Sequence, residues 1–317
     1  MRGTAAVLLL LYPAATAAAG SRWLPRASWP LRAPRAAIAT WLAATLSVIA
    51  PVVAAGLILA VPCLPASIDP AALRACLSVM RAGYTTPQGA LAAIAGGVII
   101  LGVPGRITWC MGTAIAGARR RRARHDDMLA MIARPGPAGV RVIDDAHAAV
   151  YCLPGRRRIV LTTGALRCLD GRQLDAVLAH ERAHLSGRHH LVLTFAAALQ
   201  DAFPAARFFA VAAQQIGILV EIAAADDATR REHRLTLAGA LLAVATARVP
   251  AGALGAGGTA AAYRIRRLID PPRRPSPARR ALTSVTLAGV SVLSLAAPAL
   301  ALLTITHCPP GHLIPSW

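Results

Sequence analysis

Three residues in the stretch "AVLAHERAHLSGRHH" (176–190) have the types and spacing of a catalytic metal site, with two ligands and a base. His180 and His184 are four positions apart, so on an α-helix they project from the same face. Glu181 stands beside them and can take a proton from a water molecule. In this H-E-x-x-H arrangement the two imidazoles bind zinc and the glutamate serves as the general base of a hydrolytic reaction. The pattern therefore predicts zinc-dependent hydrolysis.

The alternative is a half-exposed helix that carries ordinary polar residues. The chain has nine histidines and only three glutamates, so a chance match has odds on the order of one in several hundred. The match also falls where a helix is expected. Both observations favour a metal site.

A catalytic zinc ion usually takes three protein ligands and one water molecule. Glu221 is the best candidate for the third ligand, because it sits in "IGILVEIAAA", where an unpaired carboxylate would be costly to bury. A structural salt bridge to an arginine is the alternative role for Glu221. Glu232 lies in the solvated run "TRREHR", where neighbouring arginines account for its negative charge without a metal ion. We predict one zinc ion per chain, held by His180, His184 and Glu221, with Glu181 as the catalytic base.

Other polar residues lie close to these in the sequence. His189 and His190 follow Gly187, and we expect both to be solvated rather than to support the metal site. Asp226 and Asp227 are better candidates for holding a histidine ligand in its tautomer and orientation, and the sequence does not decide between them.

Short strands and then helices are expected around this motif. β-branched residues cluster in "RVI" and "IVLTT", with turns at Pro154-Gly155 and Gly164. A helix should begin at Asp170, a capping residue three positions before a glutamine, and end near Gly187. The next stretch is helical in composition and is broken near Pro204.

The composition indicates a membrane protein. Hydrophobic residues make up 56% of the chain and charged residues only 15%, whereas soluble domains have about a quarter charged. Four stretches approach or exceed the length of about 20 apolar residues that crosses a bilayer, roughly 3–21, 37–63, 89–118 and 281–306. The first could be a cleaved signal peptide, but a retained helix is favoured because only Arg2 precedes it and a basic loop follows.

The arginines predict how the chain is oriented. The net charge of +20 comes from arginine alone, since the chain has no lysine, and positive-inside bias accounts for it without nucleic-acid binding. Arginine-rich segments occur in the loop 22–36, after the third apolar stretch and before the fourth. That side should be the cytoplasm, with the loop 64–88 and both termini outside. Cys63 and Cys76 would flank this outside loop and could form a disulfide.

The domain organisation that follows has three parts. Residues 1–118 form three transmembrane helices, 119–280 a cytoplasmic domain that carries the zinc motif, and 281–317 a fourth transmembrane helix with a short outside tail. We therefore expect a multi-span α-helical membrane protein, with about four transmembrane helices and a cytoplasmic α+β domain. Its partners would be the lipid bilayer and a protein substrate.

The zinc motif, preceded by "VYCLPGRRRIVLTTGAL" and followed by "LVEIAAADDATRR", resembles the membrane-embedded zinc metallopeptidases of the beta-lactam sensor-transducer (BlaR/MecR) type. In that family a cytoplasmic gluzincin-like domain lies between the third and fourth transmembrane helices. The resemblance implies zinc ligation by His180, His184 and Glu221, with an aspartate behind the third ligand. It also implies cleavage of a winged-helix transcriptional repressor, often after self-cleavage.

Two features depart from that family. Its aspartate follows the glutamate ligand by four positions, whereas here Ala225 holds that position and Asp226 comes one later. The extracellular penicillin-binding domain that follows the fourth helix in the family is expected to be lacking. A housekeeping membrane metalloprotease, of the heat-shock or prenyl-protein-processing kind, and a non-proteolytic membrane regulator remain as alternatives. "IVLTT" (159–163) is expected either to be an edge strand that aligns an extended peptide or to be purely structural.

Overall fold

A computed structural model describes residues 2–61, 70–136, 139–154, 158–229, 234–248 and 265–270. The chain divides into two compact units. The first unit comprises Met1–Arg26, Thr40–Trp109 and Pro277–Trp317, and the second comprises Ala27–Ala39 and Cys110–Ser276.

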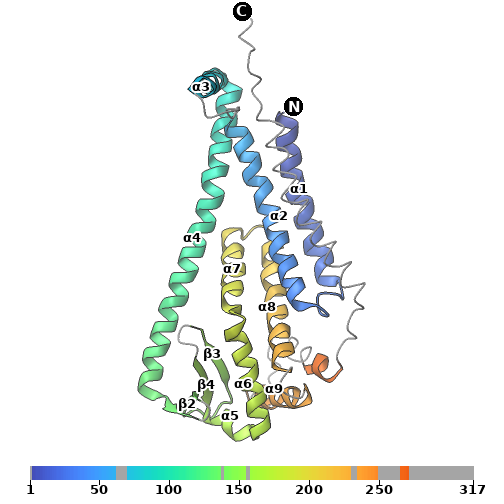
Figure 1. The fold of residues 1–317 in the computed structure, drawn as a ribbon, viewed down its shortest axis with the longest axis vertical. Coiled ribbons are helices and arrows are strands. Elements are labelled where there is room, and N and C mark those ends of the chain that lie inside the picture. The colour runs from blue at the N-terminus through green and yellow to red at the C-terminus, as the bar shows by residue number, and fades with distance from the viewer. Residues whose placement is uncertain are drawn as a thin grey trace, which may run out of the picture. The chain divides into compact units, whose positions relative to one another are not determined.

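The first unit is helical in its described residues. It contains α1 (Arg2–Trp23), most of α2 (Pro34–Ala60), α3 (Pro70–Tyr84) and the first part of α4 (Pro87–Ile132) (Figure 1). The short 3-10 helix η1 (Leu24–Arg26) follows α1. A Cβ at Gly96 would lie 2.4 Å from the carbonyl oxygen of Gly56, so α2 and α4 approach closely at a pair of glycines. Small residues permit such close packing between membrane helices.

Three helices in the described part of the chain are long and apolar enough to cross a membrane, namely α2, α4 and α8 (Arg207–Ala228). Large apolar side chains of α4 are exposed, including Leu91, Val98 and Leu101. Apolar surface of this kind is stable when lipid covers it. The apolar helices therefore suggest a membrane protein.

The expected spans are represented to different degrees. Helices α2 and α4 occur where the second and third spans were expected, and α1 is helical where the first was expected. The fourth expected span and Cys63 lie outside the described residues. Helix α4 does not end near residue 118 but continues to Ile132, and the loop 64–88, which was expected to lie outside, contains the helix α3.

Helix α8 is apolar for a different reason. In the most apolar 18-residue stretch of α8, 56% of the residues are buried, against 6% in the corresponding stretch of α4. Within the second unit, α8 packs against α6 (Gly171–Ser186) and α7 (His189–Ala202). Protein packing therefore accounts for much of its apolar composition.

The second unit contains a four-stranded sheet in the order β1-β2-β4-β3. The strands are β1 (Arg134–Pro135), β2 (Arg141–Ile143), β3 (Val150–Leu153) and β4 (Arg158–Thr162). Strand β4 pairs with β2 in parallel and with β3 in antiparallel orientation. It is thus an interior strand, and β3 forms an edge of the sheet among the described residues.

Of the two alternatives for "IVLTT", the edge strand is therefore wrong and the purely structural strand remains. The chain turns back after β3 and pairs β4 along it, with Tyr151 opposite Val160. The other side of β4 is covered by β2, and Val160 and Leu161 are fully buried. Four consecutive apolar or β-branched residues fit this buried position better than an edge.

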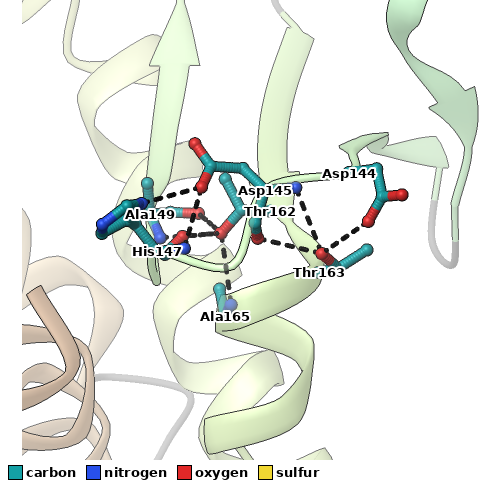
Figure 2. Close-up of polar contacts among 7 residues, drawn as sticks. All are labelled: Asp144, Asp145, His147, Ala149, Thr162, Thr163 and Ala165. Carbon is teal, nitrogen blue, oxygen red and sulfur yellow. Dashed lines mark hydrogen bonds and ion pairs between the residues drawn. The ribbon is translucent and has the colours of Figure 1, made fainter.

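The hydroxyl of Thr162 joins the end of β4 to the loop that precedes β3 (Figure 2). It donates to the carbonyl of His147 at 2.7 Å and accepts from the backbone N–H of Ala149 at 2.9 Å and of Ala165 at 3.2 Å. The contact with Ala165 also caps α5 (Thr163–Cys168). One donor and two acceptor positions are thus all used, which fixes the start of the edge strand.

Helix α6 forms where the sequence predicted it. The side chain of Asp170 accepts from the N–H of Gln173 at 2.8 Å, and the Gln173 side chain accepts from the N–H of Asp170 at 3.1 Å. This capping box satisfies two donors at the helix start, and Gly187 is the C-cap.

Apolar residues hold α6 between the sheet and two other helices. Leu178 and Leu185 pack with the sheet core, while Ala176 and Val177 pack with residues of α8 and α9 (Arg234–Arg248). Burying a leucine fully contributes roughly 1.5–3 kcal/mol. The polar residues of α6 are thereby held on a rigid element.

Candidate metal centre

Helix α6 brings the two predicted histidine ligands together. The Nε2 atoms of His180 and His184 are 3.2 Å apart, and their rings meet edge to face with centroids 4.8 Å apart. His180 is only 3% exposed. Two nitrogens this close either share one proton in a hydrogen bond or direct their lone pairs at one cation, so the arrangement is compatible with a metal ion.

Glu221 enters the same site from α8. Its carboxylate oxygens lie 3.7 Å from Nε2 of His180 and 3.7 Å from Nε2 of His184. One ligand atom from each of the three residues lies within 4.8 Å of the others. The structure therefore assembles the His180, His184 and Glu221 group that the sequence predicted.

This group fits zinc in its chemistry and dimensions. A tetrahedral ion with bonds of about 2.0–2.1 Å separates its ligand atoms by roughly 3.3 Å. The separations of 3.2 and 3.7 Å bracket that value. Nδ1 of His180 is buried and has no hydrogen-bond partner among the described residues, whereas Nε2 faces the other two groups. Two imidazoles and one carboxylate are a common donor set for a hydrolytic zinc site.

Glu181, the predicted base, lies mostly buried next to the edge strand. Burial raises its pKa above the ordinary value, while His180 and a hydrogen bond with the Cys152 thiol oppose that shift. Cys152 lies on β3, and burial together with the nearby Glu181 raises its pKa to about 12. The thiol is therefore a neutral neighbour of the carboxylate. No local sequence pattern points to Cys152, because its contact joins two elements that are separated along the chain.

His189 is not solvated, contrary to the sequence-based expectation. It is 8% exposed, and its Nδ1 lies 3.2 Å from Nδ1 of His184. Burial lowers its pKa below the ordinary value, and the neighbouring Asp227 acts in the opposite direction. The expectation failed because Arg188 adopts a left-handed backbone conformation that folds the chain back toward α6. His190 is half-buried, and burial and the nearby Arg122 and Arg188 lower its pKa.

The two aspartates after Glu221 both pair with arginines. Asp226 accepts from Nη1 of Arg267 at 2.6 Å and from Nη2 at 3.1 Å. Asp227 forms an ion pair of 2.5 Å with Arg35, which lies near the start of α2. These arginines are distant in the sequence, so the sequence could not indicate either pair. Whether either aspartate supports a metal ligand stays a prediction.

Comparison with known proteins adds independent support for the type of domain. Residues 116–250 match the model of peptidase family M48. The matched segment is less than half of the 317 residues, and it includes the candidate ligands and base, His180, Glu181, His184 and Glu221. The match supports a zinc metallopeptidase domain of the M48 type and implies metalloprotease activity. Comparisons with curated proteins and with solved structures found no match.

Proposed function

We propose that this chain is an integral-membrane zinc endopeptidase that holds zinc with His180, His184 and Glu221 and uses Glu181 as the general base. One observation carries the proposal: Nε2 of His180, Nε2 of His184 and the carboxylate of Glu221 converge on one point. A second carboxylate, that of Glu181, follows His180 directly on the same helix. The family match over residues 116–250 supports the same chemistry.

Each residue has a role that follows from its position. The chemistry that zinc supplies when bound is Lewis acidity, which acidifies water and polarises a peptide carbonyl. Glu181 takes the proton of the attacking water and passes it to the leaving amine, and its raised pKa makes the carboxylate a stronger proton acceptor. His180 and His184 keep their positions because α6 is capped at both ends and packed on two sides.

The edge strand β3 supplies a surface for the peptide substrate. Cys152 of β3 contacts Glu181, so the strand runs beside the base. An extended peptide that pairs with its outer side would place a main-chain carbonyl near the metal centre. We therefore assign to β3 the alignment of an extended peptide that the sequence suggested for β4.

The physiological substrate that we favour is a cytoplasmic winged-helix transcriptional repressor, with self-cleavage as a possible first step. The resemblance to the sensor-transducer type supports this substrate. The arginine distribution supports a protein of the cell membrane whose catalytic domain faces the cytoplasm and whose two termini lie outside. The M48 match fits a housekeeping membrane metalloprotease equally well. No direct binding of nucleic acid is needed in either case.

The test compares zinc content with cleavage in the full chain purified in detergent. The variants are Glu181→Gln and Glu221→Ala, with Glu232→Gln as a matched control that changes the remaining glutamate. Zinc is measured by atomic absorption, and self-cleavage and cleavage of a repressor encoded beside the gene are measured by mass spectrometry.

We expect Glu181→Gln to keep about one zinc ion per chain and lose cleavage, because a base but no ligand is removed. Glu221→Ala should lose both, and Glu232→Gln should lose neither. A wild-type protein without zinc, or a Glu181→Gln variant that cleaves as fast as wild type, would favour the non-proteolytic regulator. Proteolysis of general substrates but not of the repressor would favour the housekeeping protease.

A further inference from the structure

His189 lies against the side of a metal-ligand histidine that faces away from the metal centre. His184 directs Nε2 toward His180 and Glu221, while its Nδ1 lies 3.2 Å from Nδ1 of His189. The two rings meet nearly at right angles, with centroids 5.0 Å apart. The contact is therefore a hydrogen bond between the two Nδ1 atoms rather than ring stacking.

The tautomers follow from the direction of the ligand atom. A histidine that binds a metal ion through Nε2 needs a lone pair there, so its proton is on Nδ1. The Nδ1–H of His184 then donates, and Nδ1 of His189 accepts. Metal-binding histidines commonly donate this proton to a carboxylate or a carbonyl, which fixes the orientation of the ring. Here an imidazole takes that place.

The backbone between α6 and α7 is shaped for this contact. Arg188 has φ 49° and ψ 35°, and it is the only described non-glycine residue with positive φ. That conformation is unfavourable for a non-glycine residue. Strain of this kind persists where the surrounding structure enforces it, often at functional sites. It makes the chain reverse direction directly before His189.

Gly187 provides a second, independent constraint. A Cβ at this position would lie 2.4 Å from Nε2 of His189 and 2.7 Å from its Cδ2. Any side chain at 187 would therefore push the imidazole away from its present place. Gly187 permits the ring to lie over the end of α6, where it reaches His184.

A negative charge on α8 also acts on His189. Asp227 on α8 acts electrostatically on the His189 imidazole and is itself paired with Arg35 at 2.5 Å.

We infer that His189 is a positioning residue that holds His184 in the tautomer and orientation required for zinc binding. The absence of a side chain at Gly187 and the left-handed conformation of Arg188 place the His189 ring for this role. This inference rests on the proposed function. It predicts that His189 affects zinc affinity although it does not touch the metal ion.

The test measures zinc affinity of the full chain in detergent by competition with a fluorescent chelator, and records the visible spectrum of the cobalt(II)-loaded protein. The variants are His189→Leu, His189→Asn and Gly187→Ala. His190→Leu is the matched control, because His190 is the next residue and its polar neighbours are arginines rather than the ligands.

We expect His189→Leu to weaken zinc binding by roughly 10–100-fold and to alter the cobalt spectrum. His189→Asn should stay within a few-fold of wild type, because an amide oxygen can accept the same hydrogen bond. Gly187→Ala should resemble His189→Leu, and His190→Leu should resemble wild type.

A second comparison covers the case in which His189→Leu fails to fold. Added to His189→Ala, Gly187→Ala should cost little further affinity, because no ring atom of residue 189 remains near the added Cβ.

Wild-type affinity in a folded His189→Leu variant would overturn the inference, as would equal loss in the Leu and Asn variants, while the proposed function stands. A wild-type protein that binds no zinc would overturn the proposed function and the inference together.

Discussion

Arg267 holds the carboxylate of Asp226 with both terminal nitrogens, at 2.6 and 3.1 Å. Its Nε also donates to the backbone carbonyl of Leu31 at 3.1 Å. The Arg267 side chain is 11% exposed and that of Asp226 is 32% exposed. One guanidinium thus connects the C-terminal part of α8, which carries Glu221, to two segments that are remote in the sequence.

Replacing Asp226 with asparagine should therefore reduce stability more than zinc binding. Removing one partner of a buried ion pair costs several kcal/mol, and this half-buried pair should cost about 1–3 kcal/mol. Urea unfolding of Asp226→Asn, Arg267→Met and the double variant measures the coupling. A large drop in zinc affinity for Asp226→Asn, with unchanged unfolding, would instead show that Asp226 supports a metal ligand.

Replacing Thr162 with valine should loosen the edge strand. Valine keeps the shape but removes the acceptor for the N–H groups of Ala149 and Ala165. Leaving buried donors unpaired should lower the free energy of unfolding by about 1–3 kcal/mol. Thr163→Val is the matched control, since the Thr163 hydroxyl bonds the exposed Asp144 and Asp145 (Figure 2). Equal loss in both variants by urea unfolding would contradict a special role for Thr162.

The sequence predicted best those features that depend on local patterns. The capping residues of α6, its end at Gly187, the break near Pro204 and the approach of His180 to His184 all follow from spacing. Glu221 joins the two histidines as expected, but its side chain is 37% exposed, so the cost of burying a charge does not explain its position. Strand order depends on which segment returns beside which, and local patterns do not contain that information. This is why an interior strand was considered as an edge.

The surroundings of the metal centre were also beyond local patterns. His189 looked solvated because a glycine precedes it by two positions, yet the left-handed Arg188 turns it inward. Cys152 reaches Glu181 only after β3 has packed against α6. The partners of the two aspartates come from segments about 40 and 190 positions away. Each of these contacts is produced by tertiary packing.

The thiol of Cys152 should react slowly with alkylating reagents. Its pKa of about 12 leaves little thiolate at pH 8, so alkylation by iodoacetamide should be roughly a thousandfold slower than in the unfolded chain. Glu181→Gln should accelerate the reaction, because the nearby carboxylate is one cause of the high pKa. The measurement is a time course of labelling at Cys152 by peptide mass spectrometry. Labelling at the unfolded rate in the folded wild type would contradict the buried contact.

Acid should destabilise the metal-free protein in part through His190. Burial, Arg122 and Arg188 hold its pKa below the ordinary 6.5, so the folded state binds fewer protons than the unfolded state. The stability from this group is fully present above about pH 6.5 and is lost as the pH falls below that value. His190→Gln cannot titrate, so its free energy of unfolding should fall less between pH 7.5 and 5.5. Urea unfolding at both pH values, in the presence of a chelator, measures the difference. The same pH dependence in variant and wild type would show that His190 titrates alike in the folded and unfolded states.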